Sequence, residues 1–289
     1  MLRFVTKKLL SLAALLLLVS LLVFAVLFAL PGDPAQIILG INASPETLTA
    51  LRAELGLDRS FWTQYLDWVG NLAAGRTGRS IHYDLPVSEL IASRLAVTGP
   101  LALMAAALAA LLALPVGIWA ARRRSRLPDL AVMTLTQVGL AVPEVWLGIL
   151  LMLFFSVRLG WLPAGGFPGW AQDPWGSIQA LLLPALALGL IRAAILTRQT
   201  RSAMVEVLQE DNLRTARARG LHERTVLYIH ALKTALLPVV TILGLQLGQL
   251  LAGAVIIENV FHLPGLGRLV FQAIGQRDLP VVREIVLFM

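Results

Sequence analysis

Five long apolar runs limit this chain to one kind of fold. An α-helix rises about 1.5 Å per residue, so roughly 20 apolar residues cross the hydrocarbon core of a bilayer. The runs occupy residues 9–30, 98–121, 130–157, 178–197 and 236–257. The sequence therefore predicts an all-α integral membrane protein, a polytopic helical bundle with five complete spans.

The composition supports a membrane protein and argues against nucleic acid as a partner. Charged residues make up only 14% of the chain and hydrophobic residues 57%, whereas soluble domains are roughly 25% charged. The net charge of +7 comes mostly from arginine clusters beside the apolar runs, where topology and contact with membrane lipids account for it. The chain has no cysteine, which excludes disulfides and thiolate metal sites.

The positions of the basic residues predict how the chain crosses the membrane. Basic residues precede the first run, fill residues 122–126 and recur through residues 198–233. With alternating spans these three regions fall on one side, which the positive-inside rule assigns to the cytoplasm. The N-terminus is therefore expected in the cytoplasm and residues 31–97 outside.

The first apolar run is expected to remain as a span. It exceeds the roughly 7–15 residues of a signal-peptide core and ends at Pro31 without a small-residue cleavage site. In the external segment, a helix start at Ser44 and the aromatic residues Trp62, Tyr65 and Trp68 favour one or two short helices at the membrane surface.

Small and aromatic residues elsewhere predict packing and anchoring. Gly244, Gly248 and Gly253 in the fifth run are expected to allow close helix packing. A turn-rich external loop carries three tryptophans that are expected to anchor at the interface, namely Trp161, Trp170 and Trp175.

A polar insert at residues 208–233 separates the fourth and fifth apolar runs. Three arginines recur in it at helical spacing, Gly220 ends that pattern, and Glu223 lies near the start of a second helical segment. The insert predicts a helix, a tight turn and a helix on the cytoplasmic face. Such an exposed pair suits docking to a partner protein.

The insert resembles a motif of a transporter family. The motif-bearing residues are Arg-Thr-Ala-Arg-Ala-Arg-Gly at 214–220, then Leu221, Glu223, Arg224, residues 230–232 and residues 235–238. They are similar to the EAA loop of ABC-importer permeases, above all the variant in dipeptide, oligopeptide and nickel permease subunits. Arg214 and Lys233 stand where the general motif has Glu and Pro, as in that branch. The resemblance extends over nearly the whole chain, including residues 264–268 and 277–280.

The resemblance implies a permease bundle of the type I, MetI-like kind within an ATP-driven ABC importer for peptides or a related small solute such as a nickel chelate. It implies a heterodimer with a second permease, two cytoplasmic ABC ATPase subunits and an external substrate-binding protein. The organisation would be an N-terminal transmembrane helix at 1–30, an external segment at 31–97 and a permease core at 98–289, with coupling helices at about 208–233. The location would be the cytoplasmic (inner) membrane of a bacterium or archaeon.

In the resembling family the insert transmits ATPase movement to the spans. The residues expected to carry this coupling are Glu210, Arg214, Thr215, Ala216, Arg217, Gly220, Leu221 and Glu223. Glu210 lies four residues before Arg214, a spacing at which opposite charges pair on a helix. Gly220 is expected to adopt a positive φ, as a residue just past a helix end often does.

Polar residues within the spans are candidates for a translocation path. A charge inside a span costs several kcal/mol unless it is paired or hydrated, which singles out Glu144 and Arg192. Gln246 and Gln249 could face the same path. Glu258, at the outer end of the fifth span, is expected at an outer gate, with a structural hydrogen bond as the alternative.

The sequence contains no motif for catalysis. It lacks a Gly-x-x-x-x-Gly-Lys-Ser/Thr phosphate loop and an HExxH motif, and its four histidines are scattered. A transport subunit without cofactor or metal is expected, with ATP hydrolysis on separate subunits. Alternatives are a secondary transporter or channel, with Glu144 and Arg192 as coupling or gating charges, and a membrane scaffold that does not transport. No inverted repeat supports the transporter.

The C-terminal segment predicts the start of a sixth span. An apolar stretch begins after Pro280, is interrupted by Arg283 and Glu284, and reaches Met289. Permeases of the resembling branch continue through a sixth span here. The 289-residue form is therefore expected to be a shortened permease that assembles poorly with its partner, the alternative being that five complete spans suffice in this protein.

Overall fold

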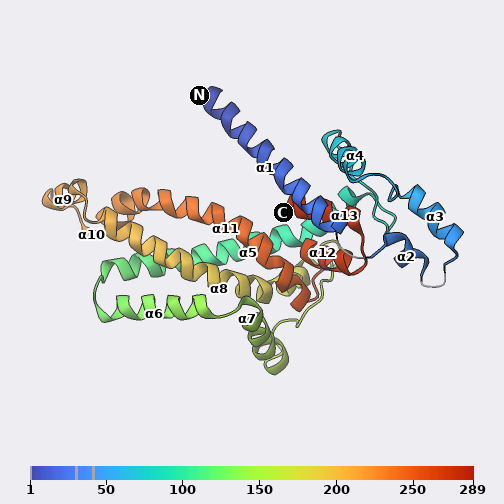
Figure 1. The fold of residues 1–289 in the computed structure, drawn as a ribbon. Helices are drawn as coiled ribbons and strands as arrows, with labels where there is room; N and C mark the ends of the chain where they lie inside the picture. Colours follow the sequence, from blue (N-terminus) through green and yellow to red (C-terminus); the bar gives the residue numbers. More distant parts are fainter. Residues whose placement is uncertain (1, 30–31, 41–42) are drawn as a thin grey trace. The chain divides into compact units, whose positions relative to one another are not determined.

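The computed structural model describes residues 2–29, 32–40 and 43–289, and these residues form helices and loops with no strand (Figure 1). This confirms the expected all-α fold. The α-helices are α1 (Leu2–Ala29), α2 (Pro34–Leu39), α3 (Pro45–Glu54), α4 (Phe61–Ala73), α5 (Val87–Arg122), α6 (Leu127–Ala141), α7 (Glu144–Leu151), α8 (Pro174–Val207), α9 (Asp211–Ala218), α10 (Glu223–Thr225), α11 (Leu232–Val260), α12 (Leu266–Gly275) and α13 (Leu279–Phe288). Two π-helical segments, η1 (Met152–Arg158) and η2 (Val226–Ala231), continue α7 and α10.

Four of the five predicted spans correspond to long apolar helices. These helices cover Arg3–Ala29, Val87–Arg122, Pro174–Val207 and Glu223–Val260. The third predicted span is instead broken into α6 and the α7–η1 helix, which meet at 98°. Pro143 lies at the break, and the residue before it, Val142, has the extended conformation that a following proline favours, with ψ of 125°.

Three helices extend well past the predicted ends of their spans. α5 begins at Val87, eleven residues before the predicted start at residue 98. α8 continues to Val207, ten residues beyond the predicted end at residue 197. The helix Glu223–Val260 runs without a break through η2, so the second predicted coupling helix and the fifth span are one element. The polar insert is thus continuous with a span on its C-terminal side, whereas a turn at residues 208–210 separates it from α8.

Residues 96–267 form one compact unit centred on α8. α8 packs against α6, α7 and α11 (Figure 1). In the apolar 18-residue stretch of α8, 72% is buried, against 28% in the corresponding stretch of Glu223–Val260. Leu101, Leu188 and Phe261 belong to one buried cluster of this unit, and Leu196 and Met204 belong to a second. α8 is therefore the helix on which the other spans of this unit depend.

Glycines bring α5 and α8 together at backbone distance. A Cβ on Gly117 would lie 2.9 Å from the carbonyl oxygen of Thr197, and one on Gly189 would lie 2.9 Å from that of Ala105. The packing expected of Gly244 and Gly248 is absent, since a Cβ at either would meet no described atom within 4 Å. Both glycines lie on the exposed side of α11, away from α8.

The loop between η1 and α8 only partly follows the prediction for its tryptophans. Trp161 and Trp175 are each 67% exposed, as interfacial anchors require. Trp170 instead packs against the buried cluster around Leu101, and its indole N–H donates to the carbonyl of Ala96 at 2.7 Å. It ties the loop to α5.

The described parts of 1–95, together with residues 268–289, form a second compact unit. Its described residues between α1 and α5 form three short helices, α2, α3 and α4, where one or two were expected. Ser44 caps α3, because its hydroxyl oxygen accepts from the Thr47 N–H. Tyr65 and Trp68 do not lie at a surface as predicted: their rings pack 5.5 and 5.8 Å from that of Phe24 in α1. Amphipathic spacing turns this face of α4 toward α1.

Two buried carboxylates from the C-terminal segment hold the loop before α5. Asp278 accepts from the Ser80 hydroxyl and from the backbone N–H groups of Ile81 and His82, both at 3.2 Å. Glu284 accepts from the Gly78 N–H at 2.7 Å. The bond to Gly78 explains why an acidic residue, Glu284, interrupts an otherwise apolar α13.

Candidate functional site

The polar insert folds into a defined turn, here called the coupling turn (residues 210–225). α9 ends at Ala218, and Gly220 follows with φ of 81°, which confirms the predicted positive φ. The Gly220 N–H donates to Arg217 O at 2.9 Å and the Leu221 N–H donates to Ala216 O at 3.3 Å. This pair of bonds is a Schellman motif, which satisfies the last carbonyls of α9 and reverses the chain toward α10.

An ion pair of Arg217 with Glu223 links the two sides of the coupling turn. The Arg217 Nε and Nη2 donate to the two carboxylate oxygens of Glu223, each at 3.2 Å. The two side chains are 37% and 49% exposed, so water reaches the pair and its own contribution to stability is at most about 1 kcal/mol. The pair fixes the angle between α9 and the long helix that starts at Glu223.

The predicted pairing of Glu210 with Arg214 is wrong. Arg214 pairs instead with Asp211, with Nη1 and Oδ1 3.1 Å apart. Glu210 precedes the first helical residue and has extended backbone angles, so the i to i+4 geometry of a helix does not apply to it. Its carboxylate accepts from the Asn212 amide at 3.1 Å.

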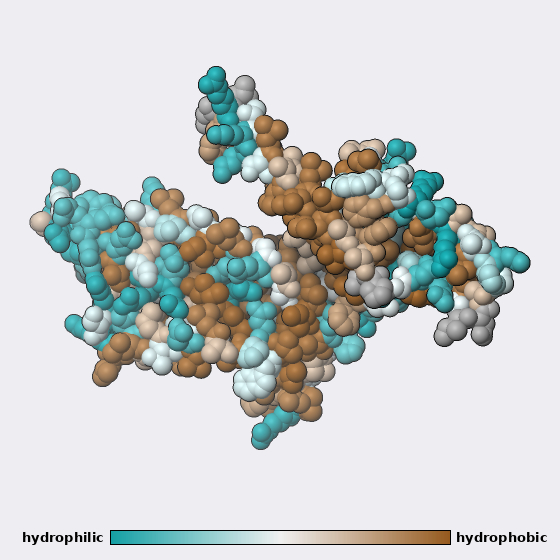
Figure 2. All heavy atoms as spheres, viewed as in Figure 1, coloured by the Kyte–Doolittle hydropathy of each residue, from teal (hydrophilic) through white to brown (hydrophobic). Residues whose placement is uncertain are grey.

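A groove of about 520 Å³ lies between α9 and the start of the long helix. Thr215, Ala216 and Leu221 line it together with the basic residues Arg219 and Lys233. Figure 2 shows hydrophilic side chains gathered at this end of the 96–267 unit, over α9 and α10. The groove brings three predicted coupling residues to one surface, whose positive charge suits an acidic partner.

Three of the four predicted path residues form one network inside the 96–267 unit. Arg192 of α8 donates from Nη2 to Glu144 Oε1 at 2.8 Å and from Nη1 to Gln249 Oε1 at 2.9 Å. The side chains of Arg192 and Glu144 are 13% and 22% exposed, so the pair is largely shielded from solvent. A Cβ on Gly253 would lie 2.8 Å from Glu144 Oε2, which explains the small residue there.

Gln246 lies outside this network. It is only 3% exposed, and neither its amide oxygen nor its amide nitrogen has a hydrogen-bond partner among the described residues. It lies three residues before Gln249 on α11 but does not join the contacts of Arg192. An unsatisfied buried amide costs roughly 1–3 kcal/mol.

The sequence did not predict a further ion pair, between Asp129 and Arg201. Asp129 at the start of α6 accepts from Arg201 Nε at 2.9 Å and from Nη2 at 2.7 Å, a bidentate pair, and from the Ser125 N–H at 2.9 Å. Asp129 thereby connects the arginine-rich loop between α5 and α6 to Arg201 of α8. The sequence signal was a lone acidic residue three positions after the last of four arginines.

Glu258 holds a turn together. It is fully buried and accepts from the Thr98 hydroxyl at 2.6 Å and from the Gly267 N–H at 2.7 Å. The Thr98 hydroxyl oxygen accepts in turn from the Leu266 N–H at 2.9 Å. These contacts match the structural hydrogen bond considered for Glu258.

Replacing Glu258 with alanine is expected to destabilise the protein by about 2–5 kcal/mol, because the Thr98 hydroxyl and the Gly267 N–H lose their buried acceptor. Thermal denaturation in detergent measures the effect. Glu206→Ala, at an exposed position of α8, is the matched control. Equal melting of the two variants would contradict the structural role of Glu258.

Comparison with known proteins gives one consistent family. The model for the "Binding-protein-dependent transport system inner membrane component" matches residues 113–289, and the model for the N-terminal part of such components matches residues 1–101. A protein of Brucella suis biovar 1 (strain 1330), named as a peptide transport system permease, is 44% identical over 285 residues, 99% of this chain and 91% of its own length. The glutathione transport system permease protein GsiC of Salmonella typhimurium (strain LT2) is 43% identical over 289 residues, 100% of this chain and 92% of its own length. The chain therefore belongs to the inner membrane components of binding-protein-dependent transport systems, the permease subunits of ABC importers.

Proposed function

We propose that this multi-pass inner membrane permease imports peptides or a related small solute, and that ATPase subunits drive it through the coupling turn. The names of its relatives, for peptide and for glutathione transport, support a peptide-like substrate. The proposed assembly contains a second permease, two cytoplasmic ABC ATPases and an external substrate-binding protein. The coupling turn and the N-terminus then face the cytoplasm, as the basic residues beside them favour.

The observation that carries this proposal is the continuity between the coupling turn and a span. The helix from Glu223 to Val260 contains 38 residues, about 57 Å at 1.5 Å per residue. Arg217 is paired with Glu223, the first residue of this helix, so a force applied at Arg217 is transmitted to the helix that carries Gln249. ATPase docking does work only if its affinity differs between the two states of the permease.

The network of Glu144, Arg192 and Gln249 is proposed to line the translocation path. A peptide carries a carboxylate, which can bind Arg192 in place of Glu144, and an ammonium group, which can bind Glu144 in place of Arg192. In this structure Arg192 binds both Glu144 and Gln249, so the three side chains satisfy one another and not a solute. Opening it would give both ends of a zwitterionic solute a partner within the membrane.

Charge reversal tests the docking role of the coupling turn. Arg217→Glu is expected to lower co-purification of the ATPase with the tagged permease several-fold, because it places two carboxylates face to face across the turn. The double variant Arg217→Glu with Glu223→Arg restores the pair and is expected to recover most of the ATPase. Arg122→Glu makes the same charge change at an exposed position and serves as the control.

Unchanged co-purification in Arg217→Glu would show that the arginines are merely a hydrated charged face. A tagged wild-type protein that transports solute but retains no ATPase would instead favour a secondary transporter or channel. A protein that does neither would favour a scaffold.

A further inference from the structure

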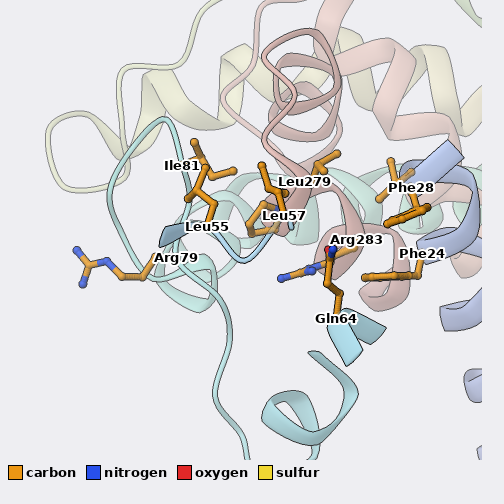
Figure 3. A pocket seen from close by; sticks show the side chains of 11 residues that line it. Phe24, Phe28, Leu55, Leu57, Gln64, Arg79, Ile81, Leu279 and Arg283 are labelled. Carbon is orange, nitrogen blue, oxygen red and sulfur yellow. The ribbon is translucent and has the colours of Figure 1, made fainter. Parts of the chain in front are cut away.

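An apolar cavity lies within the unit formed by 1–95 and 268–289 (Figure 3). It measures about 150 Å³ and lies among α1, the α3–α4 connection and the start of α13. Its apolar lining includes Phe24, Phe28, Leu55, Leu57 and Leu279. Figure 3 shows the two phenylalanines of α1 facing the leucines across the space, with the Arg283 side chain close to Phe24 and Gln64.

A second cavity of about 310 Å³ shares Arg79 and Arg283 with the first. Its lining adds Arg76, Asn71 and Thr77, together with Trp68 and Gly78. Arg79 pairs with Asp84, with Nη2 and Oδ1 3.0 Å apart, so Arg76 and Arg283 are the guanidinium groups of this space that have no ion pair among the described residues. The two cavities together offer a polar, positively charged compartment beside an apolar one.

Arg283 lines both compartments, as Arg79 does, but unlike Arg79 it forms no ion pair with any described residue. Its guanidinium stacks over the Trp68 ring at 5.3 Å, and its Nε is buried without a hydrogen-bond partner in the described chain. The neighbouring Glu284 accepts a hydrogen bond from the Gly78 N–H through one of its carboxylate oxygens. Leaving a shielded cation and a buried donor unmatched is costly, so an anion at this position would be stabilising.

The cavities lie at the depth of lipid headgroups. α1 crosses the membrane with the 27 residues Arg3–Ala29, about 40 Å of helix, which exceeds the roughly 30 Å hydrocarbon core. Phe24 and Phe28 belong to the last two turns of this helix, so they lie near its emergence from the core. A ligand here can place one part among headgroups and another among acyl chains.

We propose that this unit binds one acidic phospholipid. Its phosphate lies against Arg283 and Arg76, since guanidinium groups bind phosphate oxygens in a bidentate manner. The first part of an acyl chain fills the apolar cavity against Phe24 and Phe28. A net anionic headgroup is favoured over a zwitterionic one, because Arg76 and Arg283 already supply the positive charge that choline would add.

Native mass spectrometry of the full chain tests this proposal. The protein is purified in a neutral detergent and incubated with equal amounts of phosphatidylglycerol and phosphatidylcholine. Wild type is expected to retain one phosphatidylglycerol in preference to phosphatidylcholine by about tenfold or more, the effect of one charge-assisted contact. Two separate variants, Arg283→Gln and Arg76→Gln, are each expected to lose most of that preference. The control variant Arg59→Gln should keep it, because Arg59 pairs with Asp67 outside both cavities.

Three outcomes would overturn the proposal. Equal retention of both lipids by wild type would show that no anionic headgroup is selected. Unchanged preference in both Arg283→Gln and Arg76→Gln would place the lipid elsewhere. Inorganic phosphate that displaces phosphatidylglycerol at equal concentration would show a site for free anions in which the apolar cavity has no part.

Discussion

Replacing Gly220 with valine is expected to reduce solute uptake about tenfold or more while ATP hydrolysis by the assembled complex continues. Gly220 has φ of 81°, a conformation that costs an ordinary L-residue about 1–2 kcal/mol and a β-branched residue more. No described atom lies within 4 Å of a Cβ at this position, so the effect comes from backbone conformation alone. Uptake of a labelled peptide that wild type transports, and ATPase turnover, are measured on the same reconstituted complex.

Gly75→Val is the matched control for this variant. Gly75 also follows a helix, has φ of 71° and closes a Schellman motif, with its N–H 2.9 Å from Leu72 O and the Arg76 N–H 2.9 Å from Asn71 O. A Cβ there likewise meets nothing within 4 Å. If both variants lose uptake and ATPase turnover together, the damage lies in folding and the coupling role of Gly220 is refuted.

Removing either partner of the Glu144–Arg192 pair is expected to cost about 3–5 kcal/mol of stability, because the remaining charge stays shielded from water without its counter-ion. The single variants are Glu144→Leu and Arg192→Met, and both should lower the melting temperature in detergent. The double variant removes both charges and is expected to regain most of the stability. It should still fail to transport if the pair lines the path.

The double variant is therefore the informative one. Uptake at the wild-type level in that protein would show that the pair is purely structural. Asp67→Ala provides the comparison for an exposed pair, since Arg59 and Asp67 are 58% and 55% exposed and their pair contributes at most about 1 kcal/mol. A loss of stability in Glu144→Leu no larger than this would contradict the shielding argument.

Features that depend on neighbouring residues were predictable from the sequence. Apolar run length located four of the spans, because the bilayer sets the length of a helix that crosses it. The Schellman turn at Gly220 and the cap at Ser44 also followed from local residue patterns. In each case the physical cause lies within a few residues.

Features that depend on distant partners were not predictable in the same way. The sequence singled out Glu144 and Arg192 as costly charges but did not show that they bind each other across 48 positions. Asp278 appeared as part of a motif, while its role in holding Ser80 depends on tertiary structure. A bend opened by Pro143 was one interpretation of the sequence, but its size of 98° was not predictable, since proline within a span is compatible with a continuous helix, as Pro184 in α8 shows.

Site-specific cross-linking of the coupling turn tests the central claim most directly. The chain has no native cysteine, so a single cysteine can be introduced without background. Leu221→Cys places it in the groove at a residue 41% exposed, and Trp161→Cys places it at an exposed residue of the loop before α8. The 34 residues of α8, about 51 Å of helix, separate that loop from the segment leading to α9.

Each variant is labelled in native membranes with a thiol-reactive photo-cross-linker, and the adduct is identified by mass spectrometry. We expect Leu221→Cys to capture a P-loop ATPase subunit, with a yield that changes between ATP and ADP, and Trp161→Cys to capture none. Equal capture from both positions, or no ATPase from Leu221→Cys in a complex that transports, would contradict coupling through this turn.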